Sequence, residues 1–389
     1  NGREGKGMLV FSHHNIFGKM RDSENWFILN PLSKNADILT PEKAREIADK
    51  NYTDIEEYAA KGYLVEPDEE ERLYRNAYLD FLDERDSNEA QIFFVPWYDC
   101  NFACSYCYQE GYSREKKPLT AEVIDAFYTY LDAEFAGRKK YITIFGGEPL
   151  LPGAGARARI EQLVRGAAER GIALALVTNG YTLGEYLELL AQASIREIQV
   201  TLDGTRGAHD ARRFLKNGEP TFDRIVAGID GALERGFPVN LRMVVDRDNI
   251  DDLPELARFA IDKGWTQNPL FKTQIGRNYE LHQCQSDGAK LFDRASLYEK
   301  IYEIARKHPE FLEFHRPAYS VSRFLFENGE LPVPLFDSCP GCKNEWAFDY
   351  TGTPLPDGPH TFHARATDRA GYASGDSPAF PVVVDTAVP

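Results

Sequence analysis

The sequence lacks any run of eighteen apolar residues, so no segment of it is long enough to be a transmembrane helix. Its first seven residues are polar and lack the apolar centre of a secretory signal, and Met8 is the expected natural start. Basic residues are in the minority, with 45 Lys and Arg against 61 Asp and Glu and a formal net charge of −16. We therefore expect no general binding to nucleic acid or to a membrane surface.

Cysteine is also scarce, with 6 in 389 residues, which is too few for a disulfide scaffold of this size. Three of the six lie within eight residues, at Cys100, Cys104 and Cys107. Such clustering indicates metal ligation in a reducing compartment, so a cytoplasmic location is expected. The 43% of hydrophobic residues are enough to bury a sizeable core, in one large domain with appendages or in two to three domains.

Short apolar runs alternate with helical stretches between residues 91 and 280. This rhythm predicts an α/β fold with a parallel sheet and right-handed crossovers, namely a partial (β/α)6 TIM-like barrel. Its active site is expected at the C-terminal ends of the strands, as in complete barrels. The predicted strands are 91–95, 141–145, 172–177, 197–202, 239–245 and 270–275, and the predicted helices are 120–135, 155–171, 183–193, 222–235 and 253–263.

Residues 8–90 predict a small N-terminal α+β module in the order strand, helix, helix, strand, followed by an acidic helical stretch. The module is either winged-helix-like or a simple cap on the barrel, and the sequence favours neither. The expected elements are strands 26–30 and 63–66 and helices 41–49, 54–61 and 68–86, with further helices at 289–307 and 318–327 beyond the barrel.

The three clustered cysteines have the spacing C-x3-C-x2-C directly after the first predicted strand. A structural zinc site needs four protein ligands, but no other Cys or His lies between His14 and His209, and Asp99 would be a poor substitute. Three thiolates and one open position suit a [4Fe–4S] cluster whose fourth iron binds an exchangeable ligand.

The segment Cys100-Asn-Phe-Ala-Cys104-Ser-Tyr106-Cys107 resembles the signature of radical S-adenosylmethionine (SAM) enzymes, and the resemblance extends from about residue 91 to residue 275. It implies that the three cysteines hold a [4Fe–4S] cluster and that SAM binds the open iron. It also implies that Tyr106 packs near the adenine of SAM.

Two further motifs agree with this family in order and place. The segment Gly146-Gly147-Glu148-Pro149 follows the second strand and resembles the family's Gly-Gly-Glu-Pro motif. It implies that backbone carbonyls and the Glu148 carboxylate accept hydrogen bonds from the methionine ammonium of SAM. Asn179 ends the third strand, where the family places contacts to the ribose and substrate, although an Asn at such a turn also serves as a helix cap.

Sulfatase-maturase-like members of the family hold the SAM carboxylate with a Ser or Thr and an Arg twelve residues later. Thr201 and Arg213 fit this spacing, and a guanidinium is a natural bidentate partner for a carboxylate. Arg242, on the fifth predicted strand, points either into the barrel or into a salt bridge, and the sequence leaves both open.

The resemblance implies that the enzyme reductively cleaves SAM to a 5′-deoxyadenosyl radical, which abstracts hydrogen from a peptide or protein. An electron donor such as ferredoxin or flavodoxin would be its partner. The chain is most similar to the peptide- and protein-modifying maturases with a SPASM or twitch extension; no catalytic side chain is singled out. Two alternatives remain: a radical SAM enzyme acting on a small molecule, and an inactive barrel that serves as a binding protein.

Residues 281–353 resemble part of a SPASM or twitch extension, which binds auxiliary iron–sulfur clusters. Cys339 or Cys342 fits its first cysteine before Gly352, but Asp357 stands where the next cysteine belongs. Cys284 is a third ligand for an incomplete auxiliary site or an ordinary buried thiol. Residues 354–389 resemble the last strands of an immunoglobulin-like repeat, and they are too few for such a domain, so we expect a fusion.

Overall fold

The computed structural model describes residues 8–107, 109, 119–278, 290–316, 325, 331, 335, 358–362 and 380–384. The chain divides into two compact units, residues 1–336 and 337–389. Each unit has its own sheets, and the site lies in the first.

The centre of the first unit is a six-stranded sheet in which every pair of neighbours is parallel. The strands lie in the order β11-β10-β9-β8-β7-β6, so each strand pairs with the next one along the chain. The prediction of an α/β fold with a parallel sheet is confirmed, and the sheet is consistent with a partial barrel. The strands are β6 (Ala90–Phe94), β7 (Lys140–Ile144), β8 (Ala173–Thr178), β9 (Ile195–Thr201), β10 (Val239–Val245) and β11 (Phe271–Arg277).

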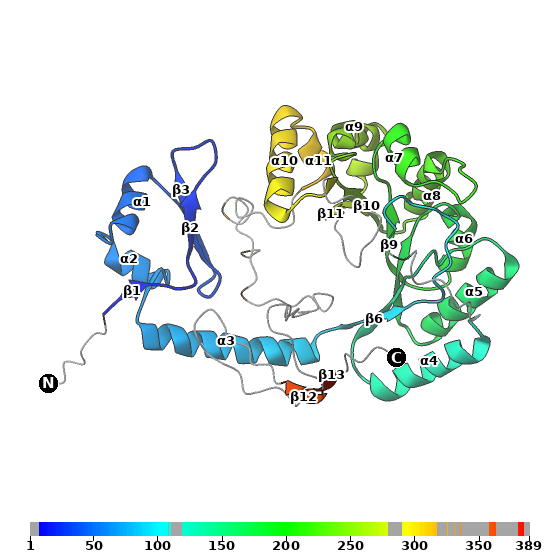
Figure 1. The fold of residues 1–389 in the computed structure, drawn as a ribbon, viewed down its shortest axis with the longest axis horizontal. Helices are drawn as coiled ribbons and strands as arrows, with labels where there is room; N and C mark the ends of the chain where they lie inside the picture. The colour runs from blue at the N-terminus through cyan, green and yellow to red at the C-terminus, as the bar shows by residue number, and fades with distance from the viewer. Residues whose placement is uncertain are drawn as a thin grey trace. The chain divides into compact units, whose positions relative to one another are not determined.

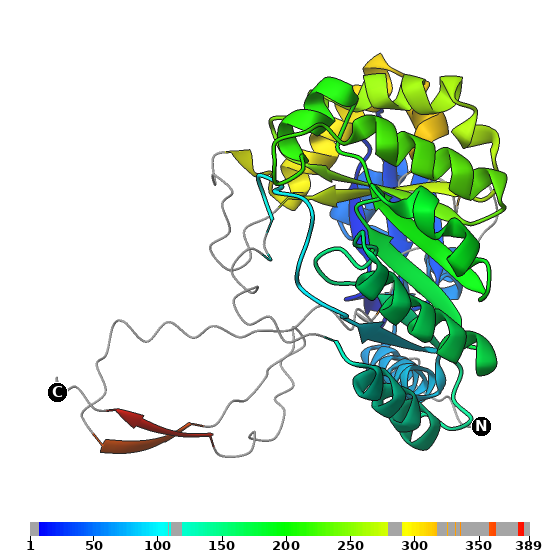
Figure 2. The same ribbon diagram turned by 90° about the vertical axis from the view of Figure 1, so that its right-hand side faces the viewer.

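Helices connect these strands and lie on the outer side of the sheet (Figure 1; Figure 2). One short helix, α7, was not predicted, and the helix expected at 289–307 begins later, where the Asp293 carboxylate accepts a hydrogen bond from the Ser296 amide at 2.7 Å. The helices are α4 (Ala121–Glu134), α5 (Ala154–Glu169), α6 (Leu183–Leu190), α7 (Arg206–Arg212), α8 (Phe222–Glu234), α9 (Leu253–Asp262), α10 (Arg294–Lys307) and α11 (Phe311–Phe314).

The two faces of the sheet differ in polarity, and this difference positions the site. In β10, Leu241, Met243 and Val245 are fully buried, whereas the alternate residues Arg242 and Val244 line a cavity. Successive side chains of a strand point to opposite faces, so the apolar set packs under the helices and the other set faces inward. A parallel sheet with both faces packed would be apolar throughout, and the polar inner positions therefore mark the cavity.

The N-terminal residues form two small antiparallel sheets with an apolar core of their own that includes Ile28, Tyr58 and Tyr63. The predicted strand–helix–helix–strand order missed β1, β2 and β4; Asn and Asp in β4 disfavour a strand, and β4 is held by pairing with β3. The winged-helix-like or cap character of residues 8–90 stays a prediction. The elements are β1 (Val10–Phe11), β2 (Ile16–Lys19), β3 (Trp26–Asn30), β4 (Asn35–Leu39), α1 (Pro41–Ala48), α2 (Ile55–Ala60), β5 (Leu64–Val65) and α3 (Pro67–Ser87).

The second unit contains one antiparallel strand pair, β12 (Gly358–Phe362) with β13 (Phe380–Val384). The immunoglobulin-like fragment expected at residues 354–389 stays a prediction. Cys284, Cys339 and Cys342 lie outside the described residues, as does nearly all of the helix expected at 318–327.

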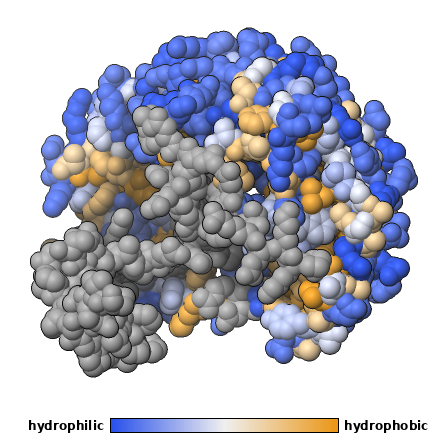
Figure 3. Space-filling view, turned by 45° about the vertical axis from the view of Figure 1, so that its right-hand side comes forward, coloured by the Kyte–Doolittle hydropathy of each residue, from blue (hydrophilic) through white to orange (hydrophobic). Residues whose placement is uncertain are grey.

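Among the described helices, none combines the length and apolar character that crossing a membrane requires. The described surface turned toward the viewer in Figure 3 is mostly hydrophilic, with separate hydrophobic patches.

Candidate active site

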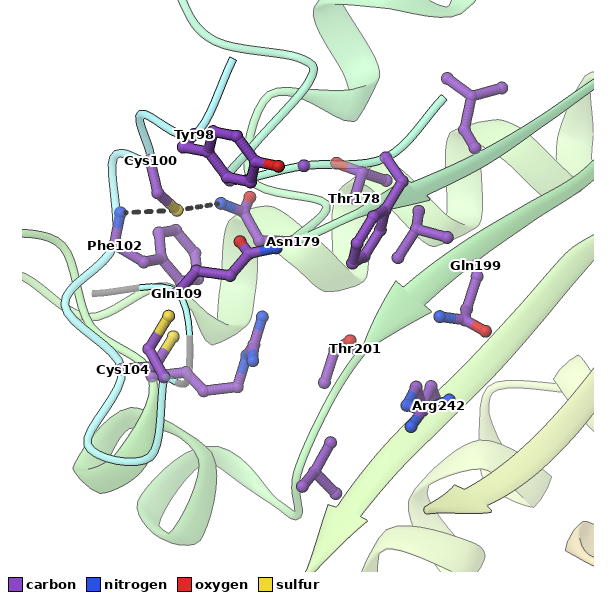
Figure 4. A pocket seen from close by; sticks show the side chains of 18 of the residues that line it. Tyr98, Cys100, Phe102, Cys104, Gln109, Thr178, Asn179, Gln199, Thr201 and Arg242 are labelled. Atoms are coloured by element: carbon purple, nitrogen blue, oxygen red, sulfur yellow. Dashed lines mark hydrogen bonds between the residues drawn. The ribbon is translucent and has the colours of Figure 1, made fainter. Parts of the chain in front are cut away.

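A cavity of about 910 Å³ lies along the inner face of the parallel sheet and reaches the loops at the strands' C-terminal ends. Residues of all six strands line it, together with the loop that follows β6 and Asn278 just after β11 (Figure 4). The sequence placed the chemistry at this end of the strands, and the cavity lies there. Predicted site residues on its lining are Cys100, Cys104, Tyr106, Cys107, Gly146, Gly147, Asn179, Thr201, Arg213 and Arg242.

The loop that carries the three cysteines is fixed to the segment after α7 by backbone hydrogen bonds. The Ala103 amide donates to the Phe214 carbonyl at 2.9 Å, and the Ser105 amide donates to the Arg212 carbonyl at 3.0 Å. Figure 4 shows the Cys100 sulfur accepting hydrogen bonds from the backbone at Phe102 and the side chain of Asn179. The loop is therefore held by contacts to the C-terminal end of α7 and to Asn179, just after β8.

The donor set of this loop fits a cluster better than a single metal ion. Among the described residues, no three His, Cys, Asp or Glu side chains lie close enough together to hold one ion. A structural zinc site needs four protein ligands around one centre, whereas this loop offers three thiols. The cysteines of a [4Fe–4S] cluster bind different irons, so they are spread more widely.

The thiols themselves are buried, and this affects their ionisation. Burial, with a further contribution from the charge of Glu148, raises the pKa of Cys100 to about 12. Burial also raises the pKa of Cys104. Because thiolates rather than thiols are metal ligands, the cysteines release protons when they bind a metal.

Arg213 is a buried cation that lines the cavity, and one of its N–H donors has no described hydrogen-bond partner. Its Nη1 donates to the Tyr106 hydroxyl at 2.8 Å, whereas its Nε is buried and has no hydrogen-bond partner in the described part of the chain. Thr201 lines the same cavity from the end of β9. A buried N–H without a partner is costly. The Nε of Arg213 and the hydroxyl of Thr201 are therefore placed to bind an acceptor such as a carboxylate.

A buried network that the sequence did not reveal surrounds Tyr106. Asp203 is fully buried and accepts hydrogen bonds from the Tyr106 hydroxyl, from Arg212 Nε at 3.4 Å and from the Val244 amide at 3.0 Å. Arg212 also forms a bidentate pair with Asp246 at 2.9 Å and lies over the Tyr106 ring, 4.8 Å from its centroid. The only sequence signal for this network was the presence of acidic residues directly after the apolar runs of β9 and β10.

His209 is part of the same support and is not a metal ligand here. Burial, followed by the charges of Arg213 and Arg212, lowers the pKa of His209 well below its usual value, so its ring is neutral. Its Nδ1 accepts from the Asp203 amide at 3.1 Å, which leaves Nε2–H to donate to the Thr221 hydroxyl at 3.1 Å. Thr221 in turn donates to the Arg213 carbonyl at 2.6 Å, so the histidine helps to fix the backbone of Arg213.

The glycines of the Gly-Gly-Glu-Pro motif allow the loop after β7 to lie directly against the loop after β6. The Gly147 amide donates to the Trp97 carbonyl at 3.0 Å, and the Glu148 amide donates to the Asp99 carbonyl at 2.9 Å. A Cβ on Gly147 would clash with the backbone carbonyl oxygens of Tyr98 and Asp99. Glycine is therefore required for this close approach beside the first cysteine.

Glu148 is not among the residues that line the cavity, and its contact with SAM stays a prediction. Its carboxylate is fully buried and accepts from the Thr178 hydroxyl at 2.6 Å, the Asn179 amide at 2.6 Å and the Leu150 amide at 2.8 Å. Burial raises the pKa of this carboxyl group. The carboxylate therefore ties the loop after β7 to the end of β8. Pro149 is also absent from the lining.

The structure also resolves what the sequence left open for Asn179 and Arg242. The Asn179 side-chain oxygen accepts from the Tyr181 amide at 3.0 Å, as a turn cap does, while its Nδ2 donates to Asn101 Oδ1 at 2.8 Å at the edge of the cavity. The Arg242 side chain points into the cavity, and within the described ranges it forms no salt bridge (Figure 4).

Replacing Gly147 by Ala should destabilise the protein, because the added methyl group meets two backbone carbonyls that cannot move independently. Overpacking of this kind costs about 3 kcal/mol. Gly184, inside α6, would have nothing within 4 Å of an added Cβ, so Gly184→Ala is the matched control and should raise helix stability slightly. Thermal unfolding of both variants measures the difference, and equal melting temperatures would contradict the close approach.

Comparisons with known proteins point to one family. The sequence model of the radical SAM superfamily matches residues 94–260. The chain is 32% identical over 261 residues to a GTP 3′,8-cyclase of Acidothermus cellulolyticus, an alignment that covers 63% of this chain and 67% of that protein. It is 28% identical over 252 residues to a probable GTP 3′,8-cyclase of Sulfurisphaera tokodaii, covering 63% of this chain and 73% of that protein.

Two further curated relatives with the same activity in their names are matched over only 46% and 50% of their own length. Among solved structures, native anSMEcpe with bound AdoMet and Cp18Cys peptide is similar with a TM-score of 0.50 and 16% identity, covering 62% of this chain and 67% of that one. At this identity the likeness supports the fold alone.

Proposed function

This chain belongs to the radical SAM superfamily, whose cofactors are a [4Fe–4S] cluster and SAM, and we propose that its cavity cleaves SAM reductively and modifies a substrate by hydrogen abstraction. The observation that carries the proposal is that three cysteines of one loop line the same cavity as Thr201 and Arg213. When bound, the cluster and SAM supply the electron transfer and the hydrogen-abstracting chemistry, and the protein supplies position and shielding.

The residues of the chain have separate tasks in this proposal. Cys100, Cys104 and Cys107 hold the cluster, and the free Nε of Arg213 binds the SAM carboxylate together with the Thr201 hydroxyl. Hydrogen bonds through the Asp203 network keep the Tyr106 ring and Arg213 in one orientation before SAM binds. Such preorganisation holds the reacting atoms in place and keeps water out.

For the substrate we propose a small molecule. The curated relatives, by their names, act on GTP, and their alignments cover 63% of this chain. The cavity of about 910 Å³ also has to hold the cluster and SAM, so the space left for a substrate is smaller than the upper limit of small-molecule sites, about 1,000 Å³. This proposal differs from the peptide substrate that the sequence resemblance favoured.

A peptide or protein substrate is the second candidate, and one observation favours it. The family match begins at residue 94, whereas the N-terminal residues fold around an apolar core of their own. A folded module outside the matched barrel offers a surface for recognising a larger substrate. Stimulation of SAM cleavage by GTP supports the first candidate, and capture of a peptide by the full chain but not by a variant altered in this module supports the second.

The central test is anaerobic reconstitution with iron and sulfide, reduction with dithionite, and detection of 5′-deoxyadenosine by mass spectrometry. We expect 5′-deoxyadenosine to form even without substrate, since SAM binding and reduction need only the cavity described here. Absence of the product from protein that carries a full cluster would favour the inactive binding protein instead.

Iron analysis of the same reconstituted protein tests the auxiliary site. We expect about four irons per chain, one [4Fe–4S] cluster, because Asp357 stands where the extension needs a cysteine. About eight irons per chain would show that a second cluster forms and that Cys339 and Cys342 belong to it.

A further inference from the structure

A second arginine of the cavity, Arg242 on β10, has no role in the proposed binding of SAM. Its guanidinium lies against Gly276 of β11, where a Cβ would be only 2.9 Å from Nη2, so the glycine makes room for it. Its side chain has no hydrogen bond or ion pair with any described residue, and Figure 4 shows it on the far side of the cavity from the cysteines.

Arg212, which lies near the same cavity, differs from Arg242 in having carboxylate partners. Arg212 is buried and has two carboxylate partners, Asp203 and Asp246. Arg242 is half-buried and has none among the described side chains, although its guanidinium is partly removed from water. A desolvated cation without a partner is unfavourable unless a ligand supplies the acceptor.

The neighbours of Arg242 add polar groups and positive charge. In the register of the sheet Arg242 lies beside Thr201, and Gln199 lies two residues earlier on β9 with its amide also directed into the cavity (Figure 4). Of the acidic residues on the lining, Glu197 is already engaged by Lys272 and by Asn240 at 2.9 Å. The basic lining residues are Arg196, Arg213, Lys216, Arg242 and Arg277, and the acidic ones are Asp99 and Glu197.

Arg196 is paired with Glu89, which leaves four basic lining residues against Asp99 and Glu197, so the cavity is more basic than the chain as a whole, whose formal net charge is −16. A cleft lined by one sign of charge concentrates ligands of the opposite sign.

We infer that Arg242, with Gln199 beside it, binds an anionic oxygen group of the substrate, either a phosphate or a carboxylate. A guanidinium can donate two parallel hydrogen bonds to either group, and a neighbouring amide can donate a third. Arg213 lies at the cysteine loop and Arg242 across the cavity, so the two arginines can hold cofactor and substrate separately. The inference rests on the proposed function in that the cavity is the active site.

The test measures binding rather than turnover. Reconstituted full-length protein with SAM is titrated by calorimetry with tripolyphosphate, GTP and glutarate. The variants are Arg242→Gln and the matched control Arg224→Gln, an exposed arginine on α8 that pairs with Glu185 at 2.6 Å. We expect Arg242→Gln to weaken binding of the preferred anion by at least about tenfold, as loss of a charged hydrogen bond does. Arg224→Gln should bind like the original protein.

The pattern of probes identifies the group: preference for tripolyphosphate and GTP indicates a phosphate, and preference for glutarate indicates a carboxylate. Equal affinities of the original protein and Arg242→Gln, or no binding of any anion, would overturn the inference. A loss of SAM affinity in Arg242→Gln as large as that in Arg213→Gln would assign Arg242 to the cofactor and also overturn it. Formation of 5′-deoxyadenosine is scored separately, so failure of the proposed function is distinguishable from failure of this assignment.

Discussion

Cys104→Ala removes the iron–sulfur cluster and with it all formation of 5′-deoxyadenosine. The loop supplies three thiols to one cavity, and within the described residues no further set of His, Cys, Asp or Glu is close enough to replace a lost ligand. With two thiols remaining, we expect iron to fall from about four per chain to well below one. Iron and sulfide analysis and mass spectrometry of the reduced protein with SAM measure both effects.

Ser105→Ala is the control for this substitution, because it changes the neighbouring side chain in the same loop. The backbone amide of Ser105 still donates to the Arg212 carbonyl at 3.0 Å, so the loop keeps its attachment. We expect this variant to retain its iron. Full iron content in Cys104→Ala would remove the basis of the proposed function, and equal losses in both variants would mean that the loop rather than the thiol was disturbed.

The sheet was predictable from the sequence because its signal is local. Each strand is a short apolar run, and the predicted strands agree with the observed ones to within about two residues at most ends. The β2 and β4 strands of the N-terminal residues were missed because they depend on pairing with β3, which is not visible in their own residues. β4 contains Asn35 and Asp37, which disfavour strands, and it exists through its pairing with β3.

The site was predictable where its residues are close in sequence and not where they are far apart. The cysteine spacing and the two glycines of the Gly-Gly-Glu-Pro motif carried a signal that could be read directly. The hydrogen bonds of the Glu148 carboxylate could not be predicted, because their donors, Thr178 and Asn179, lie about 30 positions later. Sequence alone does not reveal which buried donors a carboxylate will meet.

Arg242 illustrates the same limit. A strand pattern tells which face a residue occupies, but not whether an acidic partner lies there. The structure supplied the missing fact, since no described acidic side chain pairs with Arg242 and Gly276 leaves space beside it.

Asp203→Asn should be the most damaging substitution outside the cysteine loop. Asp203 is fully buried and joins three elements by accepting from Tyr106, Arg212 and Val244. The asparagine keeps one acceptor for the Val244 amide, but it loses the negative charge, and its amide N–H groups face donors. Arg212 then shares the buried site with Arg213 and retains only Asp246 as a carboxylate partner.

Breaking a buried pair by removing one partner costs about 3–5 kcal/mol, because the remaining charge is left without compensation. We therefore expect a clearly lower melting temperature and, since Tyr106 binds both Asp203 and Arg213, a weaker affinity for SAM. The matched control is Asp223→Asn, which removes an exposed carboxylate paired with Arg206. Exposed pairs contribute less than about 1 kcal/mol, so this variant should unfold and bind SAM like the original protein.

Thermal unfolding and SAM titration of the two variants separate a structural role from a positioning role. If Asp203→Asn lowers stability but leaves SAM affinity unchanged, the network only supports the fold, and Tyr106 and Arg213 hold their orientation without it. If stability and affinity both equal those of Asp223→Asn, the buried charges are not coupled in the way the hydrogen bonds indicate. A fall in both quantities is the result expected if one carboxylate orients Tyr106, which contacts Arg213, the arginine that we propose binds SAM.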